Sequence, residues 1–309
     1  MTQLDYLVTG ALGQLGRAAM ALAAQRGRRA FGVDVQEMPL DSRGAIVAMV
    51  QAQRPRCVVH CGAITNVDGC ESEPLLAHRI NGLATAWVAE AAAAAGAGLV
   101  YVSTDFVFDG RQAGVPYAVD AVPNPLSVYG ASKRLGEEAV LAHGRADFHV
   151  VRTSWVFGPG GKNFPRAILD RAKSGQPLKV VTDQVGRPTM TLDLAEALLD
   201  LADSKAKGGI YHAANEGQCS WHQFAVDILR EAGLGHVPVG TQLAADLRQK
   251  ALRPAWSVLD TSLLAKVRGK PLPHYVDALV RHLALDAKAS PGPESPPSGG
   301  TLRGKEYQK

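Results

Sequence analysis

The feature that most constrains the fold is a short apolar run at residues 4–8 that leads into a glycine-rich segment, TGALGQLG, at residues 9–16. An Ala-rich stretch with helical spacing follows and continues to Gln25. A buried strand, a glycine turn and a helix in direct succession are typical of the first unit of an α/β domain. We therefore expect the chain to pass from a first β-strand through a tight turn into a helix.

Apolar strands and helices continue to alternate through the first half of the chain. We predict strands at residues 29–33, 57–61, 99–102 and 149–153, and helices at residues 44–53, 83–95 and 127–142. Short connections between alternating strands and helices predict a parallel sheet covered on both faces. The expected fold class is α/β, with a Rossmann-type doubly wound parallel sheet.

Composition argues against several classes of protein. The 309 residues include 33 basic and 29 acidic side chains, and the basic ones are scattered, which gives little support to nucleic-acid binding. No apolar run approaches the roughly 20 residues of a membrane span, and the first residues lack the pattern of a signal peptide. The four cysteines lack CxxC spacing and are expected to be reduced. We expect a cytoplasmic protein without a nucleic-acid or membrane partner.

Gly10, Gly13 and Gly16 form a GxxGxxG pattern between the first strand and the first helix. In a dinucleotide-binding loop, one glycine makes the tight turn, one admits the pyrophosphate and one lets the helix pack on the strand. The N-terminus of the helix then offers free N–H groups to the phosphates. The alternative is a tight turn without a ligand. Because the pattern follows a strand and opens a helix, we predict a dinucleotide site that includes Gln14 and Leu15.

Asp34 ends the second predicted strand, close to the spacing of about 20 residues expected for the acid that binds the adenosine ribose. A carboxylate there repels a 2′-phosphate and favours NADH over NADPH; a solvated turn aspartate is the alternative. Three nearby arginines could offset the repulsion, namely Arg17, Arg28 and Arg43. Asp41 and Ser42 either cap a helix or contact the adenine. The cofactor is therefore expected to be NADH or NADPH.

Tyr129 and Lys133 lie four residues apart in YGASK, so a helix presents both side chains on one face. An adjacent ammonium brings the pKa of a phenol closer to neutrality, and a lysine can also hold the nicotinamide ribose. Ser103, Thr104 and Asp105 follow the fourth predicted strand, at the edge where open α/β sheets bind ligands. A hydroxyl there can donate to a substrate carbonyl oxygen. Alternatively, Thr104 and Asp105 cap a loop.

The order of these elements predicts two domains and a tail. Residues 1–157 are expected to bind the dinucleotide, and segments near 176–204 to return to that domain. Residues 158–285 are expected to form mainly a smaller mixed α/β substrate-binding domain, with helices at residues 164–173, 192–202 and 221–231. Residues 286–309 are rich in Pro, Gly and Ser and are expected to be disordered.

Several motifs in order resemble the extended short-chain dehydrogenase/reductase superfamily. These are the glycine loop, STDFVFDG, YGASK, RTSWVFG and QVGRPT. Within that superfamily, four segments closely resemble the dTDP-4-dehydrorhamnose reductase family: CGAITNVDGCESEP, RTSWVFGPGGKNF, DQVGRPT and RPAWSVLD. The resemblance extends from about Leu4 to about Leu285.

This resemblance implies reduction of the C4 ketone of dTDP-4-dehydro-6-deoxy-L-mannose, a dTDP-linked keto-deoxysugar, to dTDP-L-rhamnose. It makes Tyr129 the proton donor, Lys133 its electrostatic partner and ribose ligand, and Thr104 a hydrogen-bond donor to the carbonyl. It places the backbone of three residues beside the cofactor, namely Gly62, Ala63 and Ile64. The expected substrate contacts are Thr104, Asp105, Trp155, Asn163, Arg187 and Arg253. Guanidinium groups suit a pyrophosphate, although Trp155 could equally be a core residue and Arg253 an ordinary surface charge.

This sequence differs from related sequences at two motifs, and each difference argues against one property. Some family members carry an acidic residue just after the third glycine that helps bind Mg²⁺ at a dimer contact, whereas Arg17, Ala18 and Ala19 stand here. We therefore predict no such metal and not that dimer, which leaves a homodimer through another surface open. Dehydratases of the superfamily have Asp-Glu after the threonine, whereas Asp105 is followed here by Phe106, which cannot transfer a proton.

Two alternatives remain. One is a reductase of another nucleotide-linked keto-deoxysugar. The other is a non-catalytic NADP-binding subunit, because the regulatory subunit of methionine adenosyltransferase resembles this same family and a fold alone does not establish catalysis. The presence of Thr104, Tyr129 and Lys133 together favours an enzyme.

Overall fold

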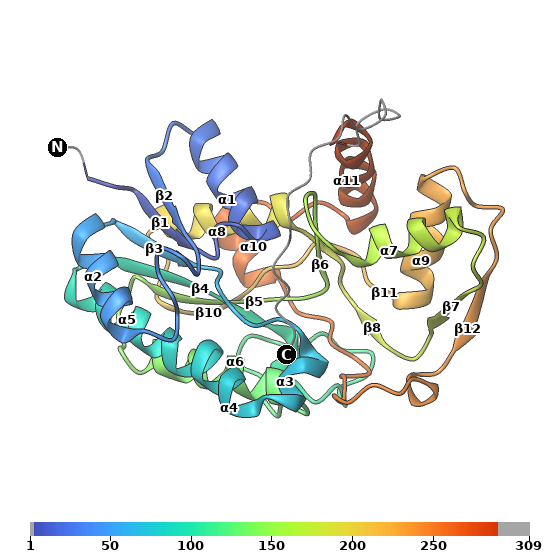
Figure 1. Cartoon of the computed structure of the whole chain (residues 1–309), viewed down its shortest axis with the longest axis horizontal. Coiled ribbons are helices and arrows are strands. Elements are labelled where there is room, and N and C mark those ends of the chain that lie inside the picture. Colours follow the sequence, from blue (N-terminus) through green and yellow to red (C-terminus); the bar gives the residue numbers. More distant parts are fainter. Residues whose placement is uncertain (1–2, 290–309) are drawn as a thin grey trace, which may run out of the picture.

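Six parallel strands form the central sheet of the chain, whose computed structural model describes residues 3–289. Across the sheet the strands are β10 (Gly209–His212), β5 (Phe148–Thr153), β4 (Gly98–Thr104), β3 (Cys57–His60), β1 (Tyr6–Thr9) and β2 (Ala30–Val33). The chain runs from β1 outward to β2 and then returns to β3 on the other side of β1 (Figure 1). This reversal confirms the predicted doubly wound α/β fold.

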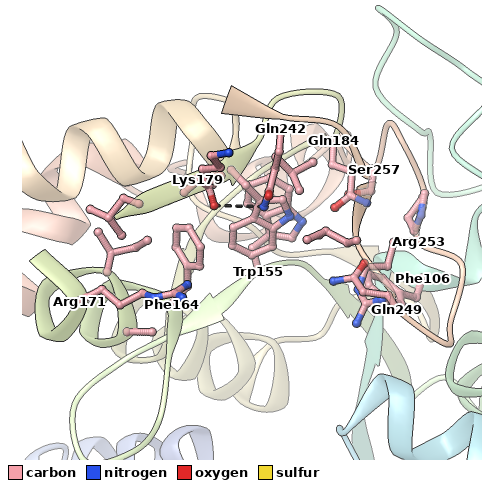
Figure 2. Close-up of a pocket in the computed structure, with 18 residues that line it drawn as sticks. Phe106, Trp155, Phe164, Arg171, Lys179, Gln184, Gln242, Gln249, Arg253 and Ser257 are labelled. Atoms are coloured by element: carbon pink, nitrogen blue, oxygen red, sulfur yellow. Dashed lines mark hydrogen bonds between the residues drawn. The ribbon is translucent and has the colours of Figure 1, made fainter. Parts of the chain in front are cut away.

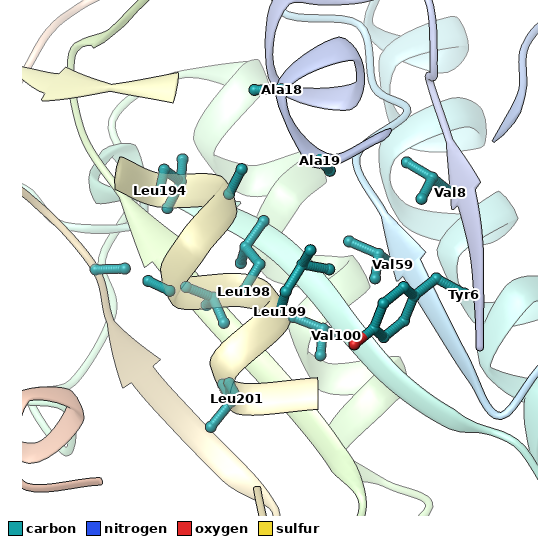
Figure 3. Packing of buried hydrophobic residues seen from close by; sticks show 14 of the residues in the cluster. Tyr6, Val8, Ala18, Ala19, Val59, Val100, Leu194, Leu198, Leu199 and Leu201 are labelled. Carbon is teal, nitrogen blue, oxygen red and sulfur yellow. The ribbon is translucent and has the colours of Figure 1, made fainter. Parts of the chain in front are cut away.

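One face of the sheet is covered by α1 (Gln14–Gln25) and α8 (Thr191–Asp203). Tyr6 and Val8 point toward these helices because side chains alternate along a strand. Figure 3 shows α8 presenting four leucines to the strands: Leu194, Leu198, Leu199 and Leu201. A further helix, α10 (Ser262–Arg268), packs beside α8. This layer joins the N-terminal strands to a helix from much later in the chain.

The opposite face is covered by α2 (Arg43–Gln53), α5 (Ala84–Ala94) and α6 (Val128–Leu141). Leu7, which lies between the two residues that face α8, points into this second layer. The alternation of core residues along one short strand therefore supplies both apolar layers. Both sides of the sheet are buried, as a parallel sheet requires.

The segment before α5 is more helical than its sequence predicts. It contains α3 (Val67–Ser72), α4 (Pro74–Ala77) and a π-helical turn, η1 (His78–Leu83), that runs directly into α5. The sequence predicted this helix only from residue 83. Pro74 occupies the first turn of α4, where its missing N–H is tolerated. π-Helical turns are often found at functional sites.

A smaller lobe is built from three two-stranded ladders and three helices, to the right in Figure 1. The ladders pair β7 (Leu178–Val181) with β12 (Val239–Gln242), β6 (Val156–Phe157) with β9 (Thr189–Met190), and β8 (Val185–Gly186) with β11 (Cys219–Ser220). The helices are α7 (Phe164–Lys173), α9 (Trp221–Glu231) and α11 (Tyr275–Ala289). Two short 3-10 turns, η2 (Asp105–Val107) and η3 (Ala244–Asp246), complete the described elements. No helix in the described part of the chain is long and apolar enough to cross a membrane.

The chain crosses between the two lobes several times. Of the segment near 176–204, α8 lies on the sheet, whereas β7 pairs with β12 in the smaller lobe. The tail predicted at 286–309 begins as a helix, because α11 continues to Ala289 and the first proline of the tail is Pro291. That prediction was wrong for these first residues, and the rest of the tail lies outside the described residues.

Shortening Leu198 tests the packing of α8 on the sheet. Leu198 is fully buried in the cluster of Figure 3, so Leu198→Ala leaves a cavity and should lower the free energy of unfolding by about 3 kcal/mol. Urea denaturation measures the change. Leu75→Ala is the matched control because that side chain is 87% exposed, and it should change stability by less than about 0.5 kcal/mol. Equal effects of the two substitutions would contradict this packing.

Candidate functional site

The carboxyl ends of the central strands open onto a cavity of about 820 Å³, here called the cofactor cavity. It lies where the sheet reverses between β1 and β3, which is where open α/β sheets hold ligands. The structure brings most of the predicted site residues together around it: Gly10, Gly13, Gln14, Leu15, Gly16, Asp34, Asp41, Gly62, Ala63, Ile64, Thr104, Asp105, Tyr129, Lys133 and Trp155.

The glycine loop packs too closely for side chains at two of its positions. Gly10 has a φ of 64°, and a Cβ there would lie 2.8 Å from Cα of Gly62 at the end of β3. A Cβ on Gly16 would lie 2.1 Å from the carbonyl oxygen of Gly10, so a larger residue would push α1 away from β1. Gly13 precedes α1 and offers no side-chain cap. The first N–H groups of α1 can therefore bind an anion.

Asp34 at the end of β2 holds the glycine loop as well as lining the cavity. Its Oδ2 accepts from the backbone N–H of Leu12 at 2.9 Å, and its Oδ1 accepts from the N–H of Val35 at 2.9 Å. A carboxylate has further lone pairs beyond these two bonds. Asp34 can therefore accept from ribose hydroxyls while it orders the loop.

The arginines near this carboxylate are directed elsewhere. Arg28 pairs with Asp203 at 2.8 Å, and Arg43 pairs with Glu90 on the surface. Arg17 stays beside the glycine loop, where its Nε donates to a backbone oxygen at 2.8 Å. Two of the three arginines expected to offset the charge of Asp34 are thus paired with other acids.

Asp41 and Ser42 separate in the structure. The Ser42 hydroxyl accepts from the backbone N–H of Ala45 at 3.3 Å and caps α2, and Ser42 does not line the cofactor cavity. The prediction of Ser42 as a cofactor contact is replaced by this helix-capping role, which satisfies an N–H at the start of α2. Asp41 lines the cavity.

Asn81 in the π-helical turn η1 is a positioning residue that the sequence reasoning missed. Its side chain is fully buried and pairs with both backbone groups of Ile64, at 2.8 and 2.9 Å. Its Nδ2 also donates to the Ser132 hydroxyl on α6 at 3.0 Å. Asn81 therefore fixes the loop after β3 relative to the helix that carries Tyr129. The available signal was a polar residue just before the predicted Ala-rich helix at residues 83–95.

Thr104, at the end of β4, contacts two of the predicted functional side chains. Its hydroxyl donates to Oδ1 of Asp105 at 3.1 Å and is near enough to the phenol of Tyr129 to act on the pKa of that phenol. It also accepts from the backbone N–H of Phe106 at 3.2 Å. The Phe106 ring meets the Tyr129 ring edge-on, with centroids 5.6 Å apart. A hydroxyl, a phenol and a carboxyl group therefore converge on one point of the cavity wall.

The Tyr129 pKa is shifted opposite to the predicted direction. Burial and the nearby Asp105 carboxylate raise the pKa of the phenol above its ordinary value, although the Thr104 hydrogen bond opposes them. Lys133 does not counter this shift, because its ammonium lies over the Tyr101 ring, 4.3 Å from the centroid. Burial lowers the pKa of Lys133 itself to about 7, opposed by the charge of Glu137. The phenol therefore keeps its proton at neutral pH.

A fully buried ion pair stands behind this cluster. Arg152 on β5 donates to both carboxylate oxygens of Glu137 on α6, through Nε at 2.8 Å and Nη2 at 2.7 Å. Ser103, the neighbour of Thr104, donates to the same carboxylate at 2.7 Å. Glu137 follows Lys133 by one turn of α6. The pair therefore holds β4, β5 and α6 in one fixed arrangement.

Asp105 carries a buried oxygen that has no hydrogen-bond partner among the described residues, Oδ2. Burial raises the pKa of this carboxyl group to about 7, although hydrogen bonds from Ser257 and Thr104 favour the charged form. The carboxyl is 2% exposed and lines the cofactor cavity. An unpaired buried oxygen is costly unless a ligand group hydrogen-bonds to it. Asp105 is therefore suited to bind a hydroxyl group of a ligand.

A second, mainly apolar cavity of about 370 Å³ adjoins the first (Figure 2). Phe106, Trp155 and Trp221 line both cavities. The two indoles are stacked, with centroids 3.6 Å apart and planes 6° from parallel. Trp155 also has a φ of 48°, which is uncommon for a residue with a side chain. The stacked indoles thus form a wall shared by the two cavities.

Of the predicted nucleotide contacts, only Arg253 lines the second cavity. Its guanidinium pairs with Asp68 at 2.8 Å. Asn163 instead caps α7 by accepting from a backbone N–H at 3.0 Å, and Arg187 donates to Glu216 at 3.4 Å. Neither Asn163 nor Arg187 lines either cavity. Both side chains hold segments of the smaller lobe together, and their contact with a substrate stays a prediction.

Comparison with known proteins gives matches along nearly the whole chain. The family model described as the RmlD substrate binding domain matches residues 4–287. A dTDP-4-dehydrorhamnose reductase of Streptomyces griseus is 38% identical over 93% of this chain and 97% of its own length. A relative from Streptomyces niveus, named dTDP-4-keto-6-deoxy-D-glucose reductase, is 32% identical over 91% of this chain and 96% of its own length.

A solved structure gives the same picture. The dTDP-4-dehydrorhamnose reductase of Bacillus anthracis str. Ames, determined in complex with NADP, superposes with a TM-score of 0.86. It is 32% identical, and the match covers 92% of this chain and all of that one. The names of these relatives agree on reduction of a dTDP-linked sugar and differ in the sugar.

Replacing Asp105 with Asn should change how stability depends on pH. The Asp105 pKa is about 7 in the folded chain and about 3.9 in an unfolded one, so between these values the folded chain keeps a proton that the unfolded chain loses. The free energy of unfolding of the wild type should therefore fall as pH rises from about 4 to about 7. Asp105→Asn cannot ionise and should gain stability relative to the wild type across this window, by as much as about 4 kcal/mol.

Urea denaturation at a series of pH values measures this difference. Asp120→Asn on the exposed loop is the control and should follow the wild type at every pH. A difference between Asp105→Asn and the wild type that does not vary between pH 4 and pH 7 would contradict the account of Asp105.

Proposed function

The chain belongs to the dTDP-4-dehydrorhamnose reductase family and is an NAD(P)H-dependent sugar-nucleotide reductase, and we propose that it converts dTDP-4-dehydro-6-deoxy-L-mannose to dTDP-L-rhamnose. The observation that carries this proposal is the convergence of Thr104, Asp105 and Tyr129 beside the wall between the two cavities. A dinucleotide in the cofactor cavity and a sugar nucleotide in the second cavity would meet at this cluster.

The cofactor cavity fits a nicotinamide dinucleotide. The glycine loop and the first N–H groups of α1 suit the diphosphate, and Asp34 has free acceptor capacity for ribose hydroxyls. Lys133, one helical turn after Tyr129, lines the same cavity and would hold the nicotinamide ribose. The bound reduced cofactor supplies the hydride that the reaction needs. The chain itself must then supply a proton and hold the ketone.

Tyr129 is in the protonation state that a proton donor needs. Because burial raises its pKa, the phenol is protonated at neutral pH and can give its proton to the ketone oxygen as that oxygen gains negative charge. The Thr104 hydroxyl, which contacts the phenol, can donate a second hydrogen bond to the same oxygen. Tyr129 would thus give the proton to the C4 oxygen, and a bound reduced cofactor would supply the hydride to C4.

The second cavity suits the nucleotide part of the substrate. Phe164 lines this cavity and can pack against a base (Figure 2). Arg253 also lines it and can bind a diphosphate if its guanidinium exchanges the Asp68 carboxylate for the phosphates. Trp155, in the shared wall, is placed to pack against the sugar. Asp105 can hydrogen-bond a sugar hydroxyl through its unpaired oxygen.

A second candidate is a reductase of a different dTDP-linked keto-deoxysugar, which the name of the Streptomyces niveus relative supports. The geometry of the proton donor would serve either sugar. Phe106 beside Tyr129 argues against dehydration because it cannot act as an acid or a base. A non-catalytic binding role is disfavoured because Thr104, Tyr129 and Lys133 are all present and line the same cavity.

A coupled assay against a panel of dTDP-, UDP- and GDP-linked keto sugars, with NADH and NADPH, tests the proposal. Cofactor oxidation should be fastest with dTDP-4-dehydro-6-deoxy-L-mannose. Faster turnover of another dTDP-linked sugar would favour the second candidate. Binding of cofactor without turnover of any sugar would favour the non-catalytic role.

Replacing Tyr129 with Phe should lower kcat by about 10²- to 10⁴-fold, because the substitution removes the donated proton and little else. The dissociation constant of the cofactor should change little. Cofactor absorbance in steady-state assays and fluorescence titration measure the two quantities. Tyr211→Phe is the control and should keep full activity. Tyr211 lies on β10, and its hydroxyl donates to the Lys207 carbonyl at 2.6 Å. Near-normal turnover by Tyr129→Phe would refute the proton-donor role.

Replacing Asp34 with Asn should shift cofactor preference toward NADPH by about tenfold, because the neutral amide no longer repels a 2′-phosphate. Asn keeps a side-chain oxygen to accept from the Leu12 N–H, so the glycine loop should stay ordered. The ratio of kcat/KM for NADPH to that for NADH measures the shift. An unchanged ratio would mean that Asp34 does not set cofactor preference.

A further inference from the structure

The cofactor cavity contains little positive charge for a ligand with a charged diphosphate. Among the described residues that line it, the cations are Lys133 and Lys162, whereas Asp34, Asp41 and Asp105 are acids. A bound dinucleotide adds its own negative charge to these. The N–H groups at the start of α1 supply only a partial positive charge. Among the described residues that line the cavity, Lys133 and Lys162 are therefore the two cations that could add a full charge to these N–H groups.

Lys133 does not carry that full charge. Its side chain is buried near Tyr129, and its ammonium lies over the Tyr101 ring. Because burial lowers its pKa to about 7, the lysine is uncharged in part of the molecules at neutral pH. Lys162 is exposed, and within residues 3–289 it forms no salt bridge with a carboxylate. Its full charge is available to a ligand.

Lys162 is fastened to the glycine loop through Gln14. We call residues 158–163, between β6 and α7, the strap. Gln14, the first residue of α1, donates from Nε2 to the Lys162 carbonyl at 3.0 Å. Its Oε1 accepts from Nδ2 of Asn163 at 3.3 Å. A Cβ on Gly161 would lie 2.7 Å from Cγ of Gln14, so the strap lies directly on this side chain.

The strap is also anchored to the smaller lobe. Nδ2 of Asn163 donates to the Gly158 carbonyl at 2.7 Å and closes the strap on itself, while Oδ1 of Asn163 caps α7. The next residue, Phe164, packs on Trp221 with centroids 4.6 Å apart. The strap is thus held at both ends, and Lys162 is placed beside the N-terminus of α1 by fixed contacts.

We propose that Lys162 binds the diphosphate of the dinucleotide and that Gln14 is the positioning residue that holds it there. This inference rests on the proposed function, since it concerns the cofactor of that reaction. It also explains why Gln14 and Asn163, predicted to contact different ligands, contact each other. The strap belongs to the smaller lobe and Gln14 to the larger one, so the diphosphate would be held by both lobes.

Affinity for ligands with and without a diphosphate tests the role of Lys162. Lys162→Met should weaken NADH, NADPH and ADP-ribose each by about tenfold, because one charged hydrogen bond is lost. It should leave the affinity for adenosine, which has no phosphate, within about twofold. Lys162→Arg should bind nearly as well as the wild type because it keeps the charge. Isothermal titration calorimetry measures all four ligands, and Lys173→Met at the exposed end of α7 is the matched control, expected to bind like the wild type.

Three results would overturn the assignment. Unchanged affinities for Lys162→Met would mean that this lysine does not reach the cofactor. A loss confined to NADPH would place Lys162 at the 2′-phosphate instead of the diphosphate. An equal loss for adenosine would indicate a general effect on the cavity and not a contact with the diphosphate. Failure of the wild type itself to bind NADH, NADPH and ADP-ribose would instead refute the proposed function, and the inference with it.

A double-mutant cycle tests the role of Gln14. Gln14→Leu removes both side-chain hydrogen bonds to the strap and should weaken ADP-ribose several-fold when Lys162 is present. In the Lys162→Met background the same substitution should have almost no further effect, because Gln14 acts through Lys162. Equal effects of Gln14→Leu in the two backgrounds would show that Gln14 acts independently and would refute its positioning role.

Discussion

Glu137 and Arg152 face each other with no exposure to solvent, and both oxygens of the carboxylate are engaged by the guanidinium. Removing one partner of such a buried pair typically costs about 3–5 kcal/mol, because the other charge is left uncompensated. The pair joins β5 to α6, and its contact with Ser103 adds β4. Lys133 on α6 and Thr104 on β4 are thereby held in fixed positions. Ser103 strengthens the link through its own bond to Glu137. The arrangement of Thr104, Asp105 and Tyr129 therefore depends on the Glu137–Arg152 ion pair, which lines neither cavity.

Much of the larger lobe could be predicted because its signals are local. A strand that alternates core residues between two faces, and a loop where Gly10 and Gly16 admit no side chain, are visible in a few consecutive residues. Asn81 could not be given a role in advance, since its partners come from β3 and α6 and meet it only after folding. The same limit applies to Tyr129. Spacing places it near Lys133, but its pKa depends on burial by distant segments and on the direction taken by the Lys133 ammonium.

The smaller lobe was harder to predict for a related reason. Its three described ladders each bring together strands that are far apart in the chain. Four of these strands have only two residues each. Such strands form because other parts of the chain position them, and not through their own sequence pattern. Their placement decides which predicted polar residues face a ligand. Arg253 lines the second cavity, whereas Asn163 and Arg187 support the loops around it. The stacked Trp155 and Trp221 then form the wall between the cofactor cavity and the second cavity.

Transfer of a label from cofactor to sugar tests the central claim most directly. The chain would be incubated with dTDP-4-dehydro-6-deoxy-L-mannose and reduced cofactor that carries deuterium in the transferring position at nicotinamide C4, and the product examined by NMR. The expected product is dTDP-L-rhamnose with deuterium at C4 of the sugar. A product without deuterium at that carbon, or cofactor oxidation without a reduced sugar, would contradict the account.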